Sequence, residues 1–417
     1  MSFRWLTNCR IRGIVYCYCK MRRKIYEMKL SDRAAGLTPS EPRRIYDAAQ
    51  KYSGVIDLTL GDPDLPPPPN VREAACRAIE AGKTRYSANA GLLELRKAIA
   101  EDARKEYNMT FDPASEIIVT VGAMESAYLC LWSLLEPGDE AIIPAPFWIN
   151  YREVVKSLGA KPVFVETRPE DAFVVRPEEI EKRITPKTRL LVLNSPANPT
   201  GAVIPGEVLD RIAELAKKYD LSVVSDEIYG HLVFDGKHAE SILTRPGMRE
   251  RTAVVNGFSK RYAMTGWRVG WTLAPAQLVR VMIQMTENIV ACAPLPSQYA
   301  AIEALSDRTD ESYIRWEFEK RRNCLLEELR SIPEIVSTGT PATFYAFLDV
   351  SRTGMSGEEF AMSLLKSKQV AVIHGSAYGG PAYRNFIRIA FTMDCAELRK
   401  AFTRIREFLA ERKGAAK

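Results

Sequence analysis

Residues 189–229 read RLLVLNSPANPTGAVIPGEVLDRIAELAKKYDLSVVSDEIY, in which an apolar run leads through a turn into an amphipathic helical pattern and then into a second apolar run. The two runs, 189–194 and 221–226, are short and largely apolar, which is typical of strands buried on both faces of a parallel sheet. The helical pattern between them, 206–219, has one apolar face that can cover such a sheet. The stretch therefore predicts a strand, a covering helix and a further strand.

The same alternation continues on both sides, from about residue 71 to residue 290. Helical patterns such as ESAYLCLWSLL, which starts at Glu125, separate further apolar runs. Strands are expected at 116–121, 139–144, 161–166, 252–257 and 269–274. We therefore predict an α/β fold whose large domain holds a mostly parallel, doubly wound sheet with helices on both faces.

After about residue 290 the pattern changes to that of a smaller α+β domain, in which strands at 343–350 and 386–392 accompany helices. The segment 38–70 contains LTLGDPDLPPPP and is expected to form an extended strap on the surface, because proline interrupts helices. The predicted organisation is a basic N-terminal extension (1–30), a strap that joins the small domain (31–72), a large domain (73–290) and a small C-terminal domain (291–417).

The net charge of +6 comes from the first thirty residues. These hold eight Lys or Arg and one acidic residue, a net +7, which leaves 6 minus 7, or −1, for the rest of the chain. The body is therefore not expected to bind nucleic acid through a basic surface. Three interpretations of the extension stay open: a targeting peptide, an arm that binds nucleic acid or metal, and a segment that is disordered or untranslated, with translation starting at Met28.

Composition argues against several other classes of protein. No apolar run reaches the roughly 20 residues that a membrane-spanning helix needs, so no membrane partner is expected. Three histidines are too few for a histidine-rich metal site, and no metal is expected. The cysteines after the extension read as buried residues of a protein in a reducing compartment, which indicates the cytoplasm: Cys76, Cys130, Cys292, Cys324 and Cys395.

Polar groups follow the expected strands at their carboxyl ends, the edge where open parallel sheets bind ligands. After the strand expected at 116–121, the chain turns at Gly122, Ala123 and Met124 into a helix whose free N–H groups can hold a phosphate. Trp148 follows the strand expected at 139–144 and offers a ring that can stack on a flat ligand. Asn198, in the turn SPANPTG, has an amide that can donate to a ligand oxygen.

Four more residues belong to the same edge. Asp226 ends the run 221–226 with Tyr229 three residues on, and Lys260 and Arg268 lie in the apolar stretch GFSKRYAMTGWRVGW, where buried charges need partners. Taken singly, these residues also fit structural roles such as a helix cap or a solvated surface. Together, a phosphate cup, a stacking ring, a carboxylate for a ring nitrogen and a lysine amine describe a site for pyridoxal 5'-phosphate held as a Schiff base.

Four motifs resemble signatures of class I pyridoxal-phosphate-dependent aminotransferases, of the aspartate aminotransferase superfamily and fold type I: NPTG, SDEIY, GFSKRYAMTGWRVGW and GKTRYSANAGLLELRKAI. The resemblance covers nearly the whole chain from about Leu30. It implies that Lys260 carries the cofactor and later acts as the base that moves the Cα proton. It also implies that Arg268 holds the cofactor phosphate and that Asp226 keeps the pyridine nitrogen protonated.

Further roles in cofactor binding follow from the resemblance. Asn198 and Tyr229 would donate hydrogen bonds to the phenolic oxygen, and Trp148 would stack on the ring. Asn198 is also expected to contact the substrate. Gly257 stands where some members of the family have a phosphate-binding serine, so Ser259 or backbone N–H groups are expected to replace that contact.

The resemblance implies three more contacts, two of them to the substrate. Arg388, in FIRIAF of the small domain, is similar to the residue that grips the substrate α-carboxylate as a bidentate pair. Gly61, in LGDPD, is similar to the glycine whose backbone lies over the substrate. Tyr86 looks like the tyrosine that reaches the phosphate of the neighbouring subunit, which implies a homodimer with shared active sites.

The resemblance predicts an aminotransferase that moves an amino group from an L-amino acid, with aspartate the leading donor, to a 2-oxo acid such as 2-oxoglutarate by a ping-pong mechanism. Aromatic, alanine and diaminopimelate-type donors stay open, as do a C–S β-lyase and a cyclopropane-forming synthase on the same scaffold. A hypothesis of another class, a nucleic-acid-binding protein that uses the basic extension, is disfavoured because no helix-turn-helix pattern precedes the body.

Overall fold

The structure is a computed structural model that describes residues 28–31, 35–36, 41–306 and 309–415. The chain divides into two compact units, Met1–Leu37 and Thr38–Lys417. Every element named below belongs to the second unit. The predicted basic extension lies almost entirely outside the described residues, so the interpretations of that segment stay predictions.

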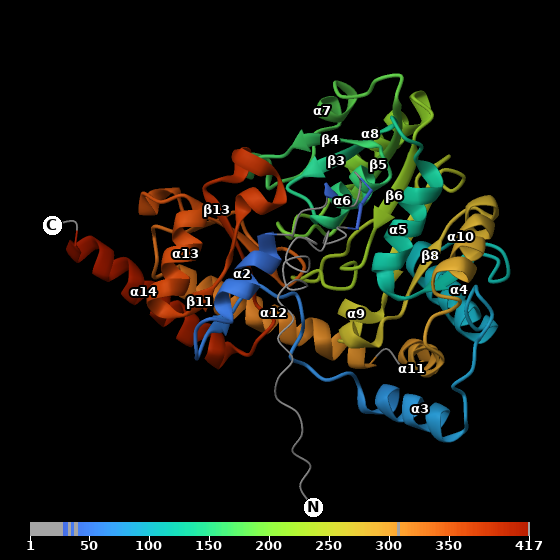
Figure 1. Cartoon of the computed structure of the whole chain (residues 1–417), viewed down its shortest axis with the longest axis horizontal. Coiled ribbons are helices and arrows are strands. Elements are labelled where there is room, and N and C mark those ends of the chain that lie inside the picture. The colour runs from blue at the N-terminus through green and yellow to red at the C-terminus, as the bar shows by residue number, and fades with distance from the viewer. Residues whose placement is uncertain (1–27, 32–34, 37–40, 307–308, 416–417) are drawn as a thin grey trace, which may run out of the picture. The chain divides into compact units, whose positions relative to one another are not determined.

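A seven-stranded sheet lies at the centre of one half of this unit (Figure 1). Its strands are β2 (Ile117–Thr120), β3 (Glu140–Ala145), β4 (Lys161–Glu166), β5 (Thr188–Asn194), β6 (Ser222–Asp226), β7 (Thr252–Gly257) and β8 (Gly270–Leu273). Across the sheet they follow the order β2, β8, β7, β6, β5, β3, β4. Neighbours run parallel except at β8, which is antiparallel to both β2 and β7. The mostly parallel sheet predicted from the sequence is confirmed.

Helices cover both faces of the sheet, because neighbouring residues of a strand point to opposite faces. Val192 and Val224 pack on one face, and Leu191 and Val223, one position earlier, pack on the other. The first face is covered by α5 (Gly122–Leu134), α6 (Asn150–Ser157) and α10 (Ala276–Ile289). The second face is covered by α4 (Leu93–Tyr107), α8 (Gly206–Lys218) and α11 (Leu295–Ser306). The remaining helices of this half are α3 (Pro69–Glu80), α7 (Pro177–Glu181) and α9 (Phe258–Arg261).

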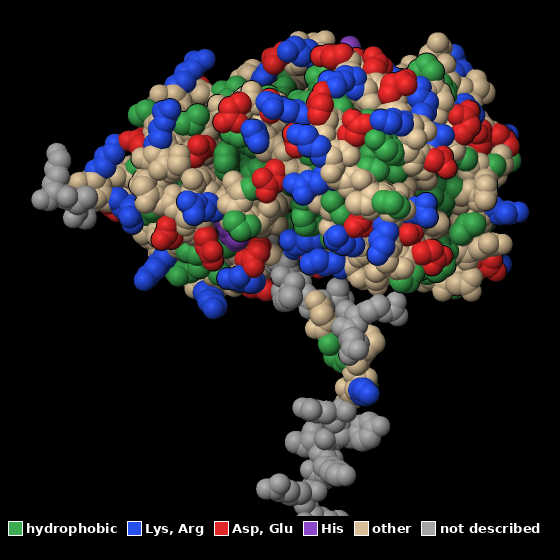
Figure 2. All heavy atoms as spheres, turned by 90° about the horizontal axis from the view of Figure 1, so that it is seen from above, with side chains coloured by type: hydrophobic (Ala, Val, Ile, Leu, Met, Phe, Trp, Pro, Cys, Tyr) green, Lys and Arg blue, Asp and Glu red, His purple; other side chains and the backbone are tan. Residues whose placement is uncertain are grey.

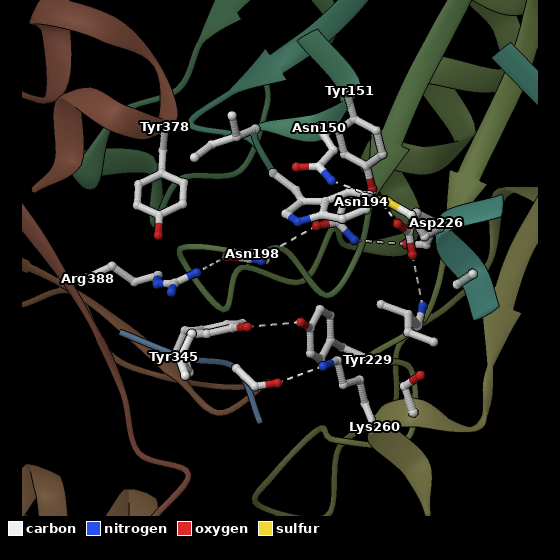
Figure 3. A pocket seen from close by; sticks show the side chains of 18 of the residues that line it. Asn150, Tyr151, Asn194, Asn198, Asp226, Tyr229, Lys260, Tyr345, Tyr378 and Arg388 are labelled. Atoms are coloured by element: carbon white, nitrogen blue, oxygen red, sulfur yellow. Dashed lines mark hydrogen bonds between the residues drawn. The ribbon is translucent and has the colours of Figure 1, made fainter. Parts of the chain in front are cut away.

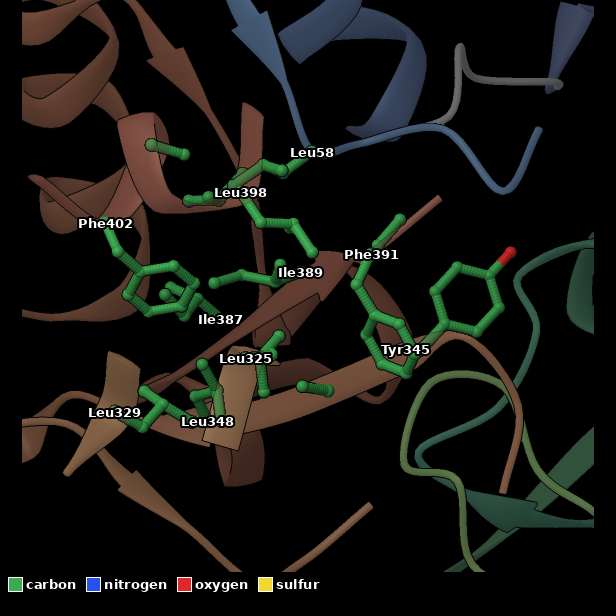
Figure 4. Close-up of a cluster of buried hydrophobic side chains, with 14 of the residues drawn as sticks. Leu58, Leu325, Leu329, Tyr345, Leu348, Ile387, Ile389, Phe391, Leu398 and Phe402 are labelled. Atoms are coloured by element: carbon green, nitrogen blue, oxygen red, sulfur yellow. The ribbon is translucent and has the colours of Figure 1, made fainter. Parts of the chain in front are cut away.

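A second, antiparallel sheet has the strand order β12, β13, β10, β9. Its strands are β9 (Val336–Ser337), β10 (Tyr345–Asp349), β12 (Ile373–His374) and β13 (Phe386–Ala390). Beside it lie α2 (Glu41–Ala49), α12 (Thr309–Leu329), α13 (Gly357–Lys368) and α14 (Cys395–Ala415), and a two-stranded pair, β1 (Ile56–Asp57) with β11 (Val370–Ala371). Leu348, Ile387 and Phe402 lie in the buried core of this α+β part, shown in Figure 4.

Helix α11 packs against α3 and α4, next to the large sheet. The predicted boundary at residue 290 assigned this helix to the small domain. The described part of the chain from Glu41 onward belongs to a single compact unit, and the division into a large and a small domain stays a prediction.

The segment 38–70 differs from the extended surface strap that its prolines predicted. Glu41–Ala49 form the helix α2, and β1 pairs in parallel with β11. Leu58 follows β1 and is fully buried in the core of Figure 4. The prediction was wrong for this half of the segment because the prolines concentrate at 63–69, where they cannot prevent a helix or a buried strand upstream.

Surface charge on the body is mixed in sign. Figure 2 shows Lys and Arg side chains interspersed with Asp and Glu side chains on the face that it displays. Many of these groups form exposed ion pairs, such as Arg104 with Glu101 and Lys182 with Glu179. Within the described residues, no helix combines the length and the apolar character needed to cross a membrane.

Close approach of β8 to α5 fixes where this helix begins at the sheet edge. A Cβ on Gly270, the first residue of β8, would lie 2.6 Å from the backbone carbon of Gly122 and would overlap the backbone nitrogen of Ala123. Gly122 has φ of +75°, a left-handed conformation that favours glycine. These two glycines let the N-terminus of α5 meet the end of the sheet.

Replacing Gly270 by alanine is expected to lower the free energy of unfolding by about 2 kcal/mol or more, because neither backbone atom can move without shifting α5. Urea unfolding followed by circular dichroism measures this change. Gly266→Ala is the matched control, since a Cβ at position 266 meets no atom within 4 Å. A Gly270→Ala protein as stable as this control would show that the close approach is wrong.

Candidate active site

A cavity of about 350 Å³ lies at the carboxyl ends of β5 and β6, between the two sheets (Figure 3). The start of α5, the turn into α6 and helix α9 supply one part of its wall, and β10, β13 and the segment after β1 supply the other. The sequence-predicted residues that line it are Gly61, Ala123, Met124, Trp148, Asn198, Asp226, Tyr229, Ser259, Lys260, Arg268 and Arg388. The structure therefore brings together groups that are more than 300 residues apart in the chain.

Lys260 lies on the short helix α9, and its amine points into the cavity. Its Nζ donates a hydrogen bond of 2.7 Å to the backbone carbonyl of Gly61. Loss of hydration is the main reason why the pKa of Lys260 falls to about 8. The carboxylate of Asp62 opposes this fall in pKa, and the nearby cations Arg268 and Arg388 contribute to it. Near neutral pH this amine is therefore easier to deprotonate than an ordinary lysine.

Asp226 ends β6 and is buried at the back of the cavity. Its Oδ1 accepts a 3.1 Å hydrogen bond from the backbone N–H of Ile228, and its Oδ2 accepts a short hydrogen bond from the hydroxyl of Tyr151. Burial raises the pKa of Asp226 to about 6, and both hydrogen bonds oppose the rise. A cationic ring nitrogen placed against this carboxylate would restore its ionised form.

Two residues that the sequence interpretation missed hold Asp226 and Asn198 in place. Tyr151 donates to Asp226, and its ring meets that of Trp148 edge to face, with 5.2 Å between centroids. Asn194 donates from Nδ2 to the backbone oxygen of Asp226 at 3.1 Å and accepts from the backbone N–H of Asn198 at 2.8 Å. Asn194 is the last residue of β5, so the strand-end rule contained a signal for it.

The start of α5 forms a cup for an anion beside Arg268. Glu125 accepts a hydrogen bond from the N–H of Val121, which precedes the helix, but no side chain of the described residues caps the first helical N–H groups. A Cβ on Gly122 would overlap the guanidinium of Arg268, which donates from Nη1 to the backbone oxygen of Thr265 at 2.8 Å. Helix N–H groups and a guanidinium together suit a phosphate group.

Ser259 lines the same cavity and precedes Lys260. At Gly257 a Cβ would lie 3.0 Å from the Cα of Gly270 and 3.2 Å from the backbone oxygen of Val269. Strand β8 therefore leaves little space for a serine at position 257, which accounts for the glycine found there.

Arg388 forms the opposite end of the cavity. It donates from Nη1 to the Oδ1 of Asn198 at 3.1 Å and makes a short hydrogen bond from Nη2 to the backbone oxygen of Thr59. Its guanidinium lies 4.2 Å from the ring centroid of Tyr345. Among the described residues, the buried Nε of Arg388 and the buried hydroxyl of Tyr378 have no partner. A carboxylate at this end of the cavity would supply the missing acceptor.

Tyr345 and Tyr378 were not predicted from the sequence, because they come from the α+β part and follow no strand of the large sheet. Tyr229 was predicted, and its hydroxyl lies 3.3 Å from that of Tyr345 (Figure 3). Burial raises the pKa of Tyr229 well above its ordinary value, so its hydroxyl stays protonated and available as a donor.

Tyr86 is the one predicted site residue that lies well away from this cavity. Its side chain is 86% exposed, and it borders an apolar depression formed with Arg85 and residues 292–296. Its predicted contact with a neighbouring subunit stays a prediction.

The residues of the cavity fit pyridoxal 5'-phosphate. The uncapped start of α5 and Arg268 suit its phosphate, the buried carboxylate of Asp226 suits a protonated ring nitrogen, and Trp148 supplies a ring beside the space between them. Lys260 supplies an amine with a lowered pKa for its aldehyde. When bound, this cofactor supplies an electron sink for negative charge at the substrate Cα.

Comparison with known proteins identifies the family. The model of the family described as aminotransferase class I and II matches residues 53–405 of this chain. The chain belongs to this aminotransferase family. It is therefore a pyridoxal-phosphate-dependent aminotransferase that acts on amino acids and 2-oxo acids.

This aminotransferase is similar to named relatives over nearly its whole length. It is 39% identical to aromatic-amino-acid aminotransferase 2 of Thermococcus litoralis, over 93% of this chain and all of the relative. It is 38% identical to an aspartate aminotransferase of Pyrococcus abyssi, again over 93% of this chain and all of the relative. The solved structure of Thermus thermophilus aspartate aminotransferase with maleate superposes with a TM-score of 0.86, at 36% identity, over 92% of this chain and all of that one.

The lowered pKa of Lys260 gives a direct test of its surroundings. In the aminotransferase without cofactor, acylation of Lys260 followed by peptide mass spectrometry is expected to reach half of its maximal rate near pH 8. Exposed Lys400, whose pKa is raised by its hydrogen bond to Glu397, serves as the internal control and is expected to react only at higher pH. Identical pH profiles for the two lysines would contradict the environment described for Lys260.

Proposed function

We propose that this aminotransferase transfers the amino group of an L-amino acid, with L-aspartate as the leading donor, to a 2-oxo acid such as 2-oxoglutarate in two half-reactions. The observation that carries the proposal is the buried Nε of Arg388, which has no partner among the described residues and lies at one end of a cavity whose other end can hold the cofactor. A substrate α-carboxylate paired with Arg388 would have its Cα inside the cavity that Lys260 also lines.

In this proposal each residue has a definite task. Lys260 holds the cofactor and, once its amine is released, takes the proton from Cα, a task for which a pKa of about 8 is suitable. Asp226 stabilises a positive charge on the ring nitrogen, and Tyr151 keeps the Asp226 carboxylate oriented. Arg388 fixes the orientation of the substrate, so that one Cα bond is aligned for reaction.

The contacts to the rest of the cofactor are proposed on the same basis. Asn198 accepts from Arg388 through Oδ1, which leaves its Nδ2 as a donor toward the phenolic oxygen, and Tyr229 is proposed as the second donor. Trp148 is proposed to stack on the ring. The phosphate is proposed to be held by Arg268, by Ser259 and by the N–H groups at the start of α5, residues Gly122, Ala123 and Met124.

The backbone around Gly61 is proposed to cover the substrate. A Cβ on Gly61 would overlap the hydroxyl of Tyr345, so only glycine lets this segment approach the cavity so closely. Its carbonyl accepts from Lys260.

Aspartate as donor is supported by relatives that carry the name aspartate aminotransferase, such as that of Pyrococcus abyssi. A second candidate, an aromatic donor, is favoured by a specific observation. Leu60 and Met124 are 45% and 43% exposed and line the same cavity as Tyr345 and Tyr378, so part of the cavity lining is apolar and aromatic. The relative from Thermococcus litoralis is named as an aromatic-amino-acid aminotransferase.

We also propose that the enzyme is a homodimer with shared active sites. Tyr86 is almost fully exposed beside the apolar depression at residues 292–296, as expected of a residue that reaches a second subunit. A cytoplasmic location is proposed because Cys130, Cys324 and the other cysteines of the described residues are free thiols.

The donor is tested by incubating the holoenzyme with 2-oxoglutarate and either aspartate, phenylalanine or alanine, and by measuring glutamate and the new 2-oxo acid by mass spectrometry. Equal amounts of both products, with no product when 2-oxoglutarate is left out, are expected for the true donor. Release of pyruvate and ammonia from a cysteine-type substrate in the absence of any acceptor would instead identify a β-lyase.

Arg388→Lys is expected to lower kcat/KM for the preferred donor by about 100-fold, because lysine keeps the charge but cannot form a bidentate pair with a carboxylate. Steady-state kinetics measures this effect, and a cofactor titration serves as the control because Arg388 lies at the substrate end. A variant with unchanged kcat/KM would contradict the role proposed for Arg388.

A further inference from the structure

Two buried ionisable residues lie next to the reactive groups without lining the cavity. Arg261 follows Lys260 on α9, and Glu227 follows Asp226 at the end of β6. Arg261 is 4% exposed and Glu227 is 7% exposed. Neither has a task in the reaction proposed above, and a buried charge needs a structural or functional reason.

Both residues bind the same helix, α4, on the side of the sheet opposite α5. Arg261 forms a bidentate pair with Asp102, with distances of 2.7 Å and 3.1 Å between nitrogen and oxygen atoms. Glu227 accepts a hydrogen bond of 3.0 Å from the hydroxyl of Tyr107. Asp102 and Tyr107 lie in the last two turns of α4, so one rigid element contacts the neighbours of both reactive residues.

Glu227 also forms hydrogen bonds with residues other than those of α4. Its Oε1 accepts hydrogen bonds from the hydroxyls of Ser225 at 2.7 Å and Ser241 at 2.6 Å. Its backbone N–H donates to the oxygen of Val255 in β7 at 2.9 Å. The side chain is therefore fixed by three hydroxyl groups in a closed site, which leaves it few alternative positions.

Helix α4 is itself well anchored and does not reach the cavity. Leu95, Ile99 and Ala103 are at most 2% exposed and pack on the sheet and on α11. No residue of α4 is among those that line the cavity. Among the described residues, the polar contacts that connect Asp102 and Tyr107 to the neighbours of the reactive residues are those with Arg261 and Glu227.

We propose that α4 positions the Lys260 amine and the Asp226 carboxylate relative to each other, through the pairs Asp102–Arg261 and Tyr107–Glu227. This inference rests on the roles proposed above for Lys260 and Asp226. The two reactive residues lie on separate turns that follow different strands. Their neighbours Glu227 and Arg261 both contact α4, so this helix connects the two turns. Asp102 and Tyr107 are positioning residues, since they touch neither substrate nor cofactor.

Tyr107→Phe tests the proposal with the loss of one hydroxyl group and no change of charge. The holoenzyme variant is expected to show kcat about 10-fold below wild type with KM for the donor changed less than about twofold, because a displaced catalytic group slows the chemical step while the substrate contacts stay intact. The cofactor dissociation constant is expected to rise by a similar factor. The pH at which the visible absorption of the bound cofactor is half changed is also expected to shift. These two measurements need no amino donor, so they remain valid if the donor assignment is wrong.

Tyr219→Phe is the matched control, because the hydroxyl of Tyr219 also donates to a glutamate, Glu181, at 2.8 Å, but on an exposed surface. This control is expected to match wild type in kcat, in cofactor affinity and in absorption. If Tyr107→Phe lowers only the melting temperature and matches the control in the other three measurements, then Tyr107 is merely structural and the proposal is overturned.

A second pair of variants separates positioning from charge. Glu227→Gln keeps the length of the side chain and an oxygen acceptor for Ser225 and Ser241. Its amide NH2 can donate to the hydroxyl oxygen of Tyr107 in place of the hydrogen bond that Glu227 Oε2 accepts, so the link to α4 is kept and kcat is expected to stay within about threefold of wild type. A loss as large as that of Tyr107→Phe would mean that the charge of Glu227 acts on Asp226, which overturns the proposal. If Tyr107→Phe does not fold, Asp102→Asn weakens the pair with Arg261 instead, and an unchanged kcat in that variant overturns the proposal as well.

Discussion

The parallel pairing of β6 with β7 is the constraint on which the rest of the site depends. Asp226 at the end of β6 lies opposite Val255 of β7, and the chain then turns within a few residues to Lys260. Both strands are almost fully buried, so the acid and the amine leave the sheet at fixed points of the same edge. The backbone hydrogen bonds between the two strands thus fix where each residue leaves the sheet, and side-chain contacts then orient the amine and the carboxylate.

The charges of the cavity are arranged for ligands that carry the opposite charges. Lys260, Arg268 and Arg388 line one space, and Asp226 is buried at its back. Burial lowers the pKa of Lys260 to about 8 and raises that of Asp226 to about 6, so both groups are held closer to neutrality than in water. An anionic phosphate, a cationic ring nitrogen and a substrate carboxylate would offset the free-energy cost of burying these charges. Ligand binding is therefore expected to stabilise the cavity, because the hydrogen bonds of these four groups among the described residues are to neutral groups, such as those of Lys260 to Gly61 and of Asp226 to Tyr151.

The sequence was informative where one simple rule applies, namely that open parallel sheets bind ligands at the carboxyl ends of their strands. This rule led to Asp226, Asn198 and Lys260, and all three line the cavity. The same rule would have led to Asn194, which ends β5, but an asparagine inside an apolar run was taken as part of the strand. The alternation of strands and helices likewise predicted the large sheet, because short apolar runs that alternate with amphipathic helices are typical of buried parallel strands.

Other parts of the site depend on tertiary structure that no local pattern reveals. Tyr345 and Tyr378 reach the cavity from the α+β part, and their positions depend on how that part packs against the large sheet. Tyr151 lies within α6, where a buried aromatic side chain reads as core until Asp226 is seen beside it. The burial of Leu58 was missed because a proline-rich sequence was interpreted as one continuous strap.

The most direct measurement is to reduce the holoenzyme with borohydride, digest it and locate the cofactor by mass spectrometry. The account predicts that the added mass of reduced pyridoxal phosphate is found on Lys260, in the peptide that contains GFSK, and that the Lys260→Ala protein carries none. Cofactor attached to another lysine, or a wild-type protein that carries no cofactor after loading and reduction, would contradict the account of this site.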